Sequence, residues 1–303
     1  MNKSTLDLQQ ARRFAEPVAF ELPWGTLRGL AWGNPQGHPI LALHGWLDNA
    51  FSFLPLAEEF LQSPLAEDHF LIALDFAGHG QSDHRPAGNF YPFIDYAYDV
   101  WHVITQQEWS SVSLLGHSMG GYVTAMVAAV MPQQIRSLMT IEAFGMLTES
   151  AERTVAQLQA SFQSRWQQQF KRAPIYPDLN KAVLARTLAG DLTRELSALL
   201  VERGIAETDA GGWRFLADGY LRVRSPLRMT PAQVEDILRQ IQCPFTTVVA
   251  SAGEIEVKQA LLQWQNFVPH LERVELTGGH HVHMEQPHAI IRAFLPMCGH
   301  SVS

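Results

Sequence analysis

Residues 111–121 read SVSLLGHSMGG, and this stretch decides the fold. Its second half contains a Gly-x-Ser-x-Gly sequence from Gly116 to Gly120, preceded by a short apolar run and followed by an Ala-, Val- and Met-rich run over 121–131. The pattern predicts a buried strand, a sharp turn and a helix, and glycines on both sides of the turn let strand and helix approach closely. Ser118 is therefore predicted to stand exposed at a helix N-terminus, where partial positive charge stabilises a developing anion.

Short apolar runs of strand length recur along the whole chain and alternate with helix-like segments. This pattern is typical of a mostly parallel sheet with helices on both faces, so the predicted class is α/β with an eight-stranded sheet. The predicted strands are 18–21, 27–32, 40–43, 70–74, 111–115, 137–141, 245–250 and 273–276, and the predicted helices include 96–109, 121–131, 257–267 and 288–294.

The alternation of strand-like and helix-like segments stops between residues 145 and 228. Long helical stretches occur there at 148–171 and 179–203 without a convincing apolar strand. We predict a core of residues 15–144 and 229–303 with an inserted helical cap over 145–228. The insertion holds 12 of the 22 lysines and arginines but only 9 of the 30 aspartates and glutamates. A basic cap over an acidic core favours anionic substrates, although a solvated helical surface explains the same counts.

Composition and charge narrow the class further. The chain has 303 residues, 47% of them hydrophobic and 17% charged, as a globular protein does. A formal net charge of −8 without a basic run argues against a nucleic-acid partner. Two distant cysteines, Cys243 and Cys298, exclude a disulfide framework. No signal-peptide core and no run of about 20 apolar residues is present, which predicts a cytoplasmic protein without a membrane span; the oligomeric state stays open.

A serine hydroxyl is a weak nucleophile and needs a base within hydrogen-bond reach. Residues 278–285 read GGHHVHME and follow the last predicted strand. Side chains that follow different parallel strands converge at one edge of the sheet, outside the carboxyl ends of the strands. We therefore expect one crevice to be faced by His44, Asp75, Ser118, Glu142 and His280.

Four motifs, taken in order, resemble the α/β-hydrolase superfamily and, within it, the capped serine-hydrolase-like proteins. They are HGW at 44–46, DFAGHGQSD at 75–83, the serine motif, and Gly279-His280 with His283, Glu285 and Pro287. The resemblance implies the α/β-hydrolase fold and selects His280, directly after the glycine, as the catalytic histidine. The oxyanion hole is expected from the backbone N–H groups of Met119, the residue after the nucleophile, and, by the resemblance, of Trp46.

The position of the acidic residue that would complete the triad differs from the commonest pattern of the family. The usual acid position, in the turn after the strand that follows the cap, falls on Gly253, and Glu254 or Glu256 could replace that acid only with a shifted loop. Glu142 follows the strand 137–141, which is the alternative acid position in some relatives such as the haloalkane dehalogenases. We favour Glu142 over Glu256 and Glu254, and each of the three could instead be an ordinary surface carboxylate. A serine at position 118, where dehalogenases and epoxide hydrolases carry aspartate, disfavours those two activities.

These residues predict a serine hydrolase that cleaves a small carboxylic ester or related acyl compound without a cofactor. Carbon–carbon bond cleavage or elimination with the same triad, and a non-catalytic binding protein on this fold, remain alternatives. A metal site made by the histidines of 280–283 is disfavoured, because no carboxylate or cysteine signature accompanies them. The candidates for the substrate pocket are His44, Trp46, His117, Phe144 and Trp166.

Overall fold

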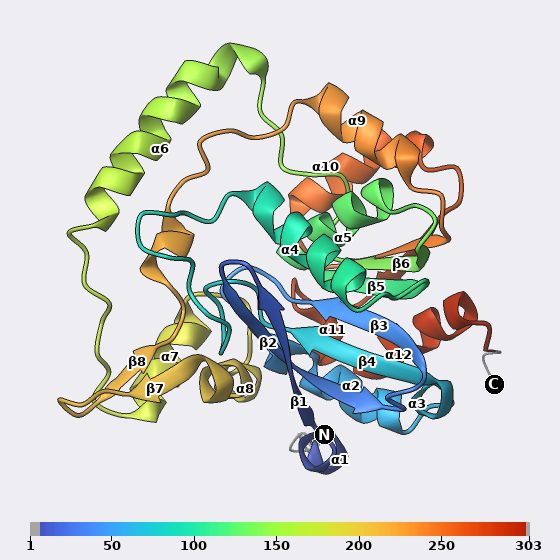
Figure 1. Cartoon of the computed structure of the whole chain (residues 1–303), viewed down its shortest axis with the longest axis horizontal. Coiled ribbons are helices and arrows are strands. Elements are labelled where there is room, and N and C mark those ends of the chain that lie inside the picture. The colour runs from blue at the N-terminus through green and yellow to red at the C-terminus, as the bar shows by residue number, and fades with distance from the viewer. Residues whose placement is uncertain (1–6, 301–303) are drawn as a thin grey trace.

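The computed structural model describes residues 7–300 and is built on an eight-stranded sheet with the order β1-β2-β4-β3-β5-β6-β9-β10 (Figure 1). Strands β1, β2 and β4 pair antiparallel, and the remaining neighbours are parallel. The sheet confirms the α/β class and contains all eight predicted strands. The strands are β1 (Glu16–Leu22), β2 (Gly25–Gly33), β3 (His38–Leu43), β4 (His69–Leu74), β5 (Val112–His117), β6 (Ile135–Ile141), β9 (Phe245–Ala250) and β10 (Leu271–Leu276).

Helices cover both faces of the sheet, which explains why its inner parallel strands are rich in buried apolar residues (Figure 1). Strands β5 and β9 are buried along their whole length. One hydrophobic cluster lies under α4 (Phe93–Gln106), α5 (Met119–Val130), α9 (Pro231–Gln240) and α10 (Ile255–Trp264). A second lies under α1 (Gln9–Arg13), α2 (Leu54–Leu61), α3 (Leu65–Asp68), α11 (Val282–Glu285) and α12 (Pro287–Phe294).

Residues 145–228, which we call the inserted segment, lie between β6 and β9 in the chain and add no strand to the main sheet. They contain α6 (Thr154–Gln168), α7 (Leu179–Leu188), α8 (Arg194–Gly204), and the small antiparallel pair β7 (Ile205–Glu207) and β8 (Trp213–Phe215). Figure 1 shows α6 standing apart from the sheet. The short 3-10 helices of the chain are η1 (Ala50–Phe53), η2 (Ala151–Arg153), η3 (Gly219–Arg222), η4 (Gln265–Phe267) and η5 (Leu295–Cys298).

Two expectations for the inserted segment were wrong. The helical stretch predicted over 179–203 is divided into α7 and α8, and Gly190 and Asp191 lie in the break between them. The segment also contains the pair β7–β8, turned through Gly211 and Gly212, which both have a positive φ. Its residues are half-buried or exposed, so no apolar run marked them. No helix within residues 7–300 is long and apolar enough to cross a membrane.

A buried ion pair holds the inserted segment against the core. Arg203, near the end of α8, places Nη2 2.7 Å from Oδ2 of Asp75, which directly follows β4. The Asp75 carboxylate also accepts hydrogen bonds from the backbone N–H groups of Ala50 (2.7 Å) and Gln81 (2.9 Å). Both members of the pair are buried, and a buried charge is tolerated only when it is paired and hydrogen-bonded. The pair therefore fixes α8 at the carboxyl end of β4.

We expect Arg203→Gln to reduce the free energy of unfolding by about 3–5 kcal/mol, because it leaves the Asp75 carboxylate buried without its counter-charge. Urea titration of the wild type and the variant measures this loss. Arg12→Gln is the matched control, since it removes the exposed pair of Arg12 with Glu202, one residue before Arg203, and should cost less than about 1 kcal/mol. An equal loss in both variants would show that the buried pair does not anchor α8.

Candidate active site

Ser118 occupies a strained turn between a strand and a helix. Strand β5 ends at His117 and α5 begins at Met119, and Ser118 between them has φ +50° and ψ −118°. Positive φ is unfavourable for a residue with a side chain and is found at sites where the surroundings enforce it. A Cβ atom at Gly120 would clash with the carbonyl of Leu43, and one at Gly116 would clash with the carbonyl of Gly120. The glycines are therefore required for the close contact that holds the turn.

Ser118 and His280 line one cavity of about 1160 Å³ at the carboxyl edge of the sheet. His280 belongs to the loop between β10 and α11. Its Nδ1 atom lies 3.4 Å from Oε2 of Glu142, which follows β6 directly. The Glu142 carboxylate is fully buried and accepts hydrogen bonds from the backbone N–H groups of Ala250 (2.7 Å) and Glu254 (2.8 Å). The structure thus brings together a serine, a histidine and a firmly held carboxylate from three strand ends.

The other two candidate acids are placed less well. The side chain of Glu254 is 55% exposed and its Oε1 lies 4.0 Å from Nδ1 of His280. Glu256 is exposed on the first turn of α10. The usual acid position is occupied by Gly253, and the structure shows why a side chain is absent there. A Cβ atom at this position would overlap the Glu142 carboxylate. The carboxylate of Glu142 therefore fills the space that a side chain at position 253 would take.

Backbone strain is concentrated at this edge of the sheet. Among residues 7–300, the non-glycine residues with positive φ are Leu47, Glu108, Ser118 and Glu142. Three of them follow β3, β5 and β6, and Leu47 and Ser118 both line the cavity. Such strain costs about 1–3 kcal/mol per residue and marks functional sites more often than ordinary turns. The strained positions thus mark the same edge as the serine motif.

The two backbone groups expected to form the oxyanion hole lie on neighbouring segments. Met119 is the first residue of α5, so its N–H has no partner within the helix. Trp46 lies in the turn after β3, which is closed by a hydrogen bond from Asp48 N–H to the Gly45 carbonyl (3.1 Å). Gly120 N–H donates to the carbonyl of His44 (3.1 Å), which joins this turn to the start of α5. Their role in binding an oxyanion stays a prediction.

The five candidates for the substrate pocket divide into two groups. Trp46 and His117 line the cavity. His44 is fully buried, donates from Nδ1 to the Gly45 carbonyl (2.7 Å) and accepts at Nε2 from Phe76 N–H (3.0 Å), so it ties two loops together; burial lowers its pKa. Phe144 packs against Phe245 in the core, and Trp166 is 67% exposed on α6, where it contacts Phe170. The structure therefore places His44, Phe144 and Trp166 outside the cavity wall.

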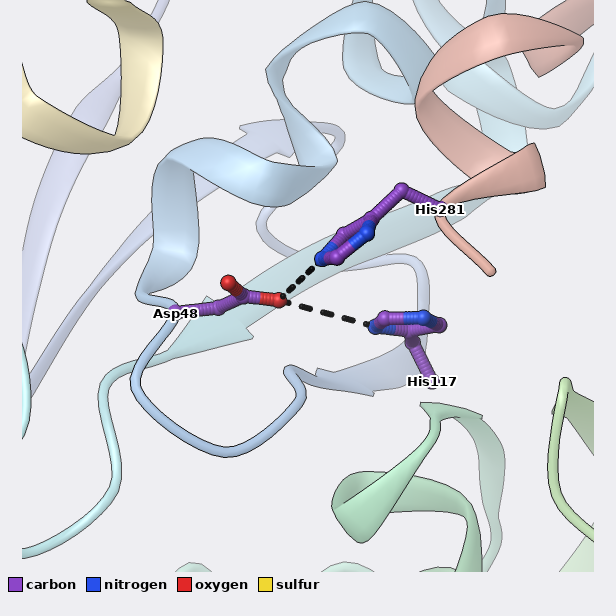
Figure 2. A group of neighbouring side chains, drawn as sticks. All are labelled: Asp48, His117 and His281. Carbon is purple, nitrogen blue, oxygen red and sulfur yellow. Dashed lines mark hydrogen bonds and ion pairs between the residues drawn. The ribbon is translucent and has the colours of Figure 1, made fainter. Parts of the chain in front are cut away.

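A charged network that the sequence did not reveal surrounds His281. Its Nδ1 lies 2.6 Å from Oδ1 of Asp191, and its Nε2 lies 3.2 Å from Oδ2 of Asp48 (Figure 2). Arg186 of α7 approaches the other oxygen of Asp48, with Nη2 2.6 Å from Oδ1. Burial lowers the pKa of His281, but the two carboxylates outweigh this effect and raise it to about 9. His281 is therefore an imidazolium that donates to a carboxylate on each side.

The same network positions the backbone of His280. Oδ2 of Asp191 accepts a hydrogen bond from the backbone N–H of His280 (2.6 Å). Asp191 belongs to the inserted segment, so a residue 89 positions away holds the loop that carries the candidate base. The available sequence signal was the Gly190-Asp191 pair within an otherwise helical run, which is typical of a helix end.

The inserted segment supplies much of the cavity wall. Its lining residues fall in three stretches, 168–176, 185–191 and 215–222. They include both basic and acidic side chains: Lys171, Arg172, Arg186, Asp191, Asp218 and Arg222. Trp46 of the core bridges to this wall, because its indole N–H donates to the carbonyl of Leu221 (3.1 Å). The cavity therefore has a floor from the sheet edge and walls from the inserted segment.

Comparison with known proteins agrees with this architecture. A serine hydrolase-like protein of Danio rerio is 30% identical over 294 residues, which cover 92% of this chain and 87% of the relative. Serine hydrolase-like protein 2 of Homo sapiens is 28% identical, covering 92% and 93% of the two chains. Among solved structures, a hypothetical protein of Pseudomonas aeruginosa PAO1 is 36% identical with a TM-score of 0.85, covering 93% of this chain and 99% of that one.

A thioesterase domain from the curacin biosynthetic pathway is 26% identical with a TM-score of 0.80, covering 93% of this chain and 99% of that one. These similarities support a hydrolase. The family model described as alpha/beta hydrolase fold matches residues 38–287, a range that includes Ser118, Glu142 and His280 together with the whole inserted segment. The chain belongs to the α/β-hydrolase superfamily.

Proposed function

We propose that the protein is a serine hydrolase that cleaves a small carboxylic ester or a related acyl compound through an acyl-enzyme. The observation that carries this proposal is the buried Glu142 carboxylate, which two backbone N–H groups hold in front of Nδ1 of His280. His280 and Ser118 line the same cavity. Thioesters belong to the same class of acyl compounds, and a similar solved structure is named a thioesterase domain.

In the proposed reaction, Ser118 Oγ attacks the carbonyl carbon while His280 takes the hydroxyl proton at Nε2. Glu142 accepts the hydrogen bond from Nδ1 of His280 and stabilises the imidazolium that forms. The backbone N–H groups of Trp46 and Met119 donate to the oxyanion of the tetrahedral intermediate. His280 then returns the proton to the leaving group. A water molecule, activated by the same histidine, releases the acid from Ser118.

The inserted segment acts in this proposal as a cap that sets specificity, because its residues line the cavity above Ser118. Arg186 is already paired with Asp48, so Lys171, Arg172 and Arg222 are the basic groups left to meet a substrate. Asp218 accepts a hydrogen bond from Tyr91 and is thereby engaged with the core. This wall favours acyl compounds that carry a polar or anionic group.

We expect Ser118→Ala to lower kcat on a short-chain p-nitrophenyl ester by roughly 10⁴-fold or more, because the nucleophile is lost. A fluorophosphonate probe should label the wild type at Ser118 and leave the variant unlabelled, as peptide mass spectrometry would show. Labelling of Ser118 without turnover of any ester would instead favour carbon–carbon cleavage or elimination by the same residues. If the probe did not label Ser118 and no ester were hydrolysed, the result would favour a binding protein.

Glu142→Gln should lower kcat by roughly 10²–10⁴-fold, since the amide can no longer stabilise the imidazolium of His280. Glu256→Gln and Glu254→Gln are the matched controls and should change kcat by less than about tenfold, because their side chains are exposed. The kinetics of the three variants on one ester decide the acid. A larger effect of Glu254→Gln or Glu256→Gln than of Glu142→Gln would contradict the assignment.

The carboxylate of the proposed triad should also function when it is moved from the end of β6 to the turn after β9. Glu142→Ser frees the space that a side chain at position 253 would fill, and Gly253 has no positive φ that would resist a side chain. We therefore expect the double variant Glu142→Ser with Gly253→Asp to recover about tenfold or more of the kcat lost in Glu142→Ser. Glu142→Ser with Gly253→Asn has the same shape without the charge and should recover nothing. Equal kcat values for the two double variants would refute the idea that only the carboxylate's location matters.

A further inference from the structure

We propose that Asp48, His117 and His281 form a site for one divalent transition-metal ion of the zinc class, on the floor of the cavity. The three side chains come from the turn after β3, the end of β5 and the loop before α11, and all three line the cavity. Their ligand atoms lie within 4.8 Å of one another. In the sequence, no carboxylate signature accompanies the histidines of 280–283. The fold brings Asp48 to His281, from which it is 233 positions away in the chain.

The spacing of the ligand atoms suits a tetrahedral ion. Oδ2 of Asp48 lies 3.2 Å from Nε2 of His281 and 3.7 Å from Nδ1 of His117. Ligands that bind zinc at about 2.0–2.1 Å in a tetrahedron are separated by roughly 3.3–3.5 Å. Figure 2 shows a nitrogen of each ring directed at the same carboxylate oxygen. Only small movements are therefore needed to place one ion between the three atoms.

His117 presents an unpartnered ring nitrogen to the Asp48 carboxylate. Its Nε2 lies 2.9 Å from the carbonyl oxygen of His280, and a carbonyl only accepts, so Nε2 carries the hydrogen. Nδ1 is buried without a hydrogen-bond partner and faces the Asp48 carboxylate. In the neutral ring, Nδ1 presents a lone pair to an anion, and a buried polar atom left in this way is costly. A metal ion between Nδ1 and Oδ2 would give Nδ1 a partner and would replace the hydrogen bond from His281 that Oδ2 accepts.

Both histidines have the outer partner that metal-binding histidines use. A metal-ligating histidine almost always donates its other N–H to a carboxylate or a backbone carbonyl. His281 does so to Oδ1 of Asp191 (2.6 Å), and His117 does so to the carbonyl of His280 (2.9 Å). The ion would take the place of the proton on His281 Nε2, while the hydrogen bond at Nδ1 is kept.

The site also has room for a fourth ligand. The three ligand residues border the cavity, from which a fourth ligand could approach. A Cβ atom at Gly45 would lie only 3.0 Å from both Oδ2 of Asp48 and Nδ1 of His117, so the glycine keeps a side chain from crowding these two atoms. Arg186 occupies only Oδ1 of Asp48 and leaves Oδ2 for the ion. Three protein ligands and one open position are the arrangement of a zinc site that exchanges water or another ligand.

Zinc binding to purified protein tests the site. A second possible group, Asp68, His69 and His300, lies elsewhere, so all measurements use a His300→Ala background. We expect equilibrium dialysis with metal quantification to give one Zn²⁺ per chain with micromolar or tighter affinity. Co²⁺ should bind with the visible absorption of a four- or five-coordinate site. Absence of binding, or only the weak spectrum of an octahedral Co²⁺, would overturn the proposal without any further variant.

Variants then locate the ion. Asp191→Asn removes only the negative charge of an outer acceptor and should weaken binding by roughly 10–100-fold. Asp48→Asn and His281→Gln remove ligands and should weaken it further, with circular dichroism confirming that each variant is folded. Glu254→Gln is the matched control, since Glu254 is a cavity carboxylate near His280 outside the group, and its affinity should equal that of the background. Unchanged binding in Asp48→Asn, or loss in Glu254→Gln, would contradict the site.

Occupancy has one consequence that rests on the proposed function. The rings of His117 and His280 have centroids 4.9 Å apart, so a dication on His117 disfavours the imidazolium that His280 must form. Zn²⁺ should therefore lower ester turnover over the concentration range in which it binds, and a chelator should restore it. Because binding is measured without substrate, a protein that binds Zn²⁺ but hydrolyses no ester would contradict the proposed function and leave the metal site supported.

Discussion

The contact between Gly120 and the carbonyl groups of Leu43 and His44 is the constraint on which the rest of the site depends. No side chain fits between these backbones, and the hydrogen bond from Gly120 N–H to the His44 carbonyl fixes their separation. The contact puts the first turn of α5 beside the turn after β3. Ser118 must then adopt positive φ to connect β5 to α5, and its side chain faces the cavity. The strain at Ser118 is offset by helix and sheet packing on both sides.

Glu142 shows that a carboxylate can reach the same point in space from different positions in the chain. Two adjacent parallel strands, β6 and β9, end beside the same space, and a carboxylate from either end can reach it. In this protein the side chain comes from β6, and the β9 end contributes Gly253 and two backbone N–H groups as hydrogen-bond donors. The positive φ of Glu142 shows that the chain bends sharply to deliver the side chain.

The sequence predicted the eight strands and the grouping of Ser118, His280 and Glu142, because these depend on local patterns and on the rule that carboxyl ends of parallel strands converge. It did not predict which pocket candidates line the cavity. Trp166 was grouped by its aromatic character, yet the direction in which α6 faces depends on packing of the inserted segment. The partners of His281 lie 90 and 233 positions away, and no local pattern identifies them.

The network around His281 joins the inserted segment to the core in one electrostatic unit. Arg186 and Asp191 belong to the inserted segment, whereas Asp48 and His281 belong to the core. Asp191 holds the backbone of His280, and Arg186 neutralises the carboxylate next to the Trp46 turn. A shift of α7 would therefore move Asp191, which follows this helix, away from the His280 backbone. The same shift would separate Arg186 from the buried Asp48 carboxylate. Because such a charge is costly when unpaired, the inserted segment cannot drift from the core while the network is intact. The wall of the cavity and the loop that carries His280 are consequently held in register by the same few side chains.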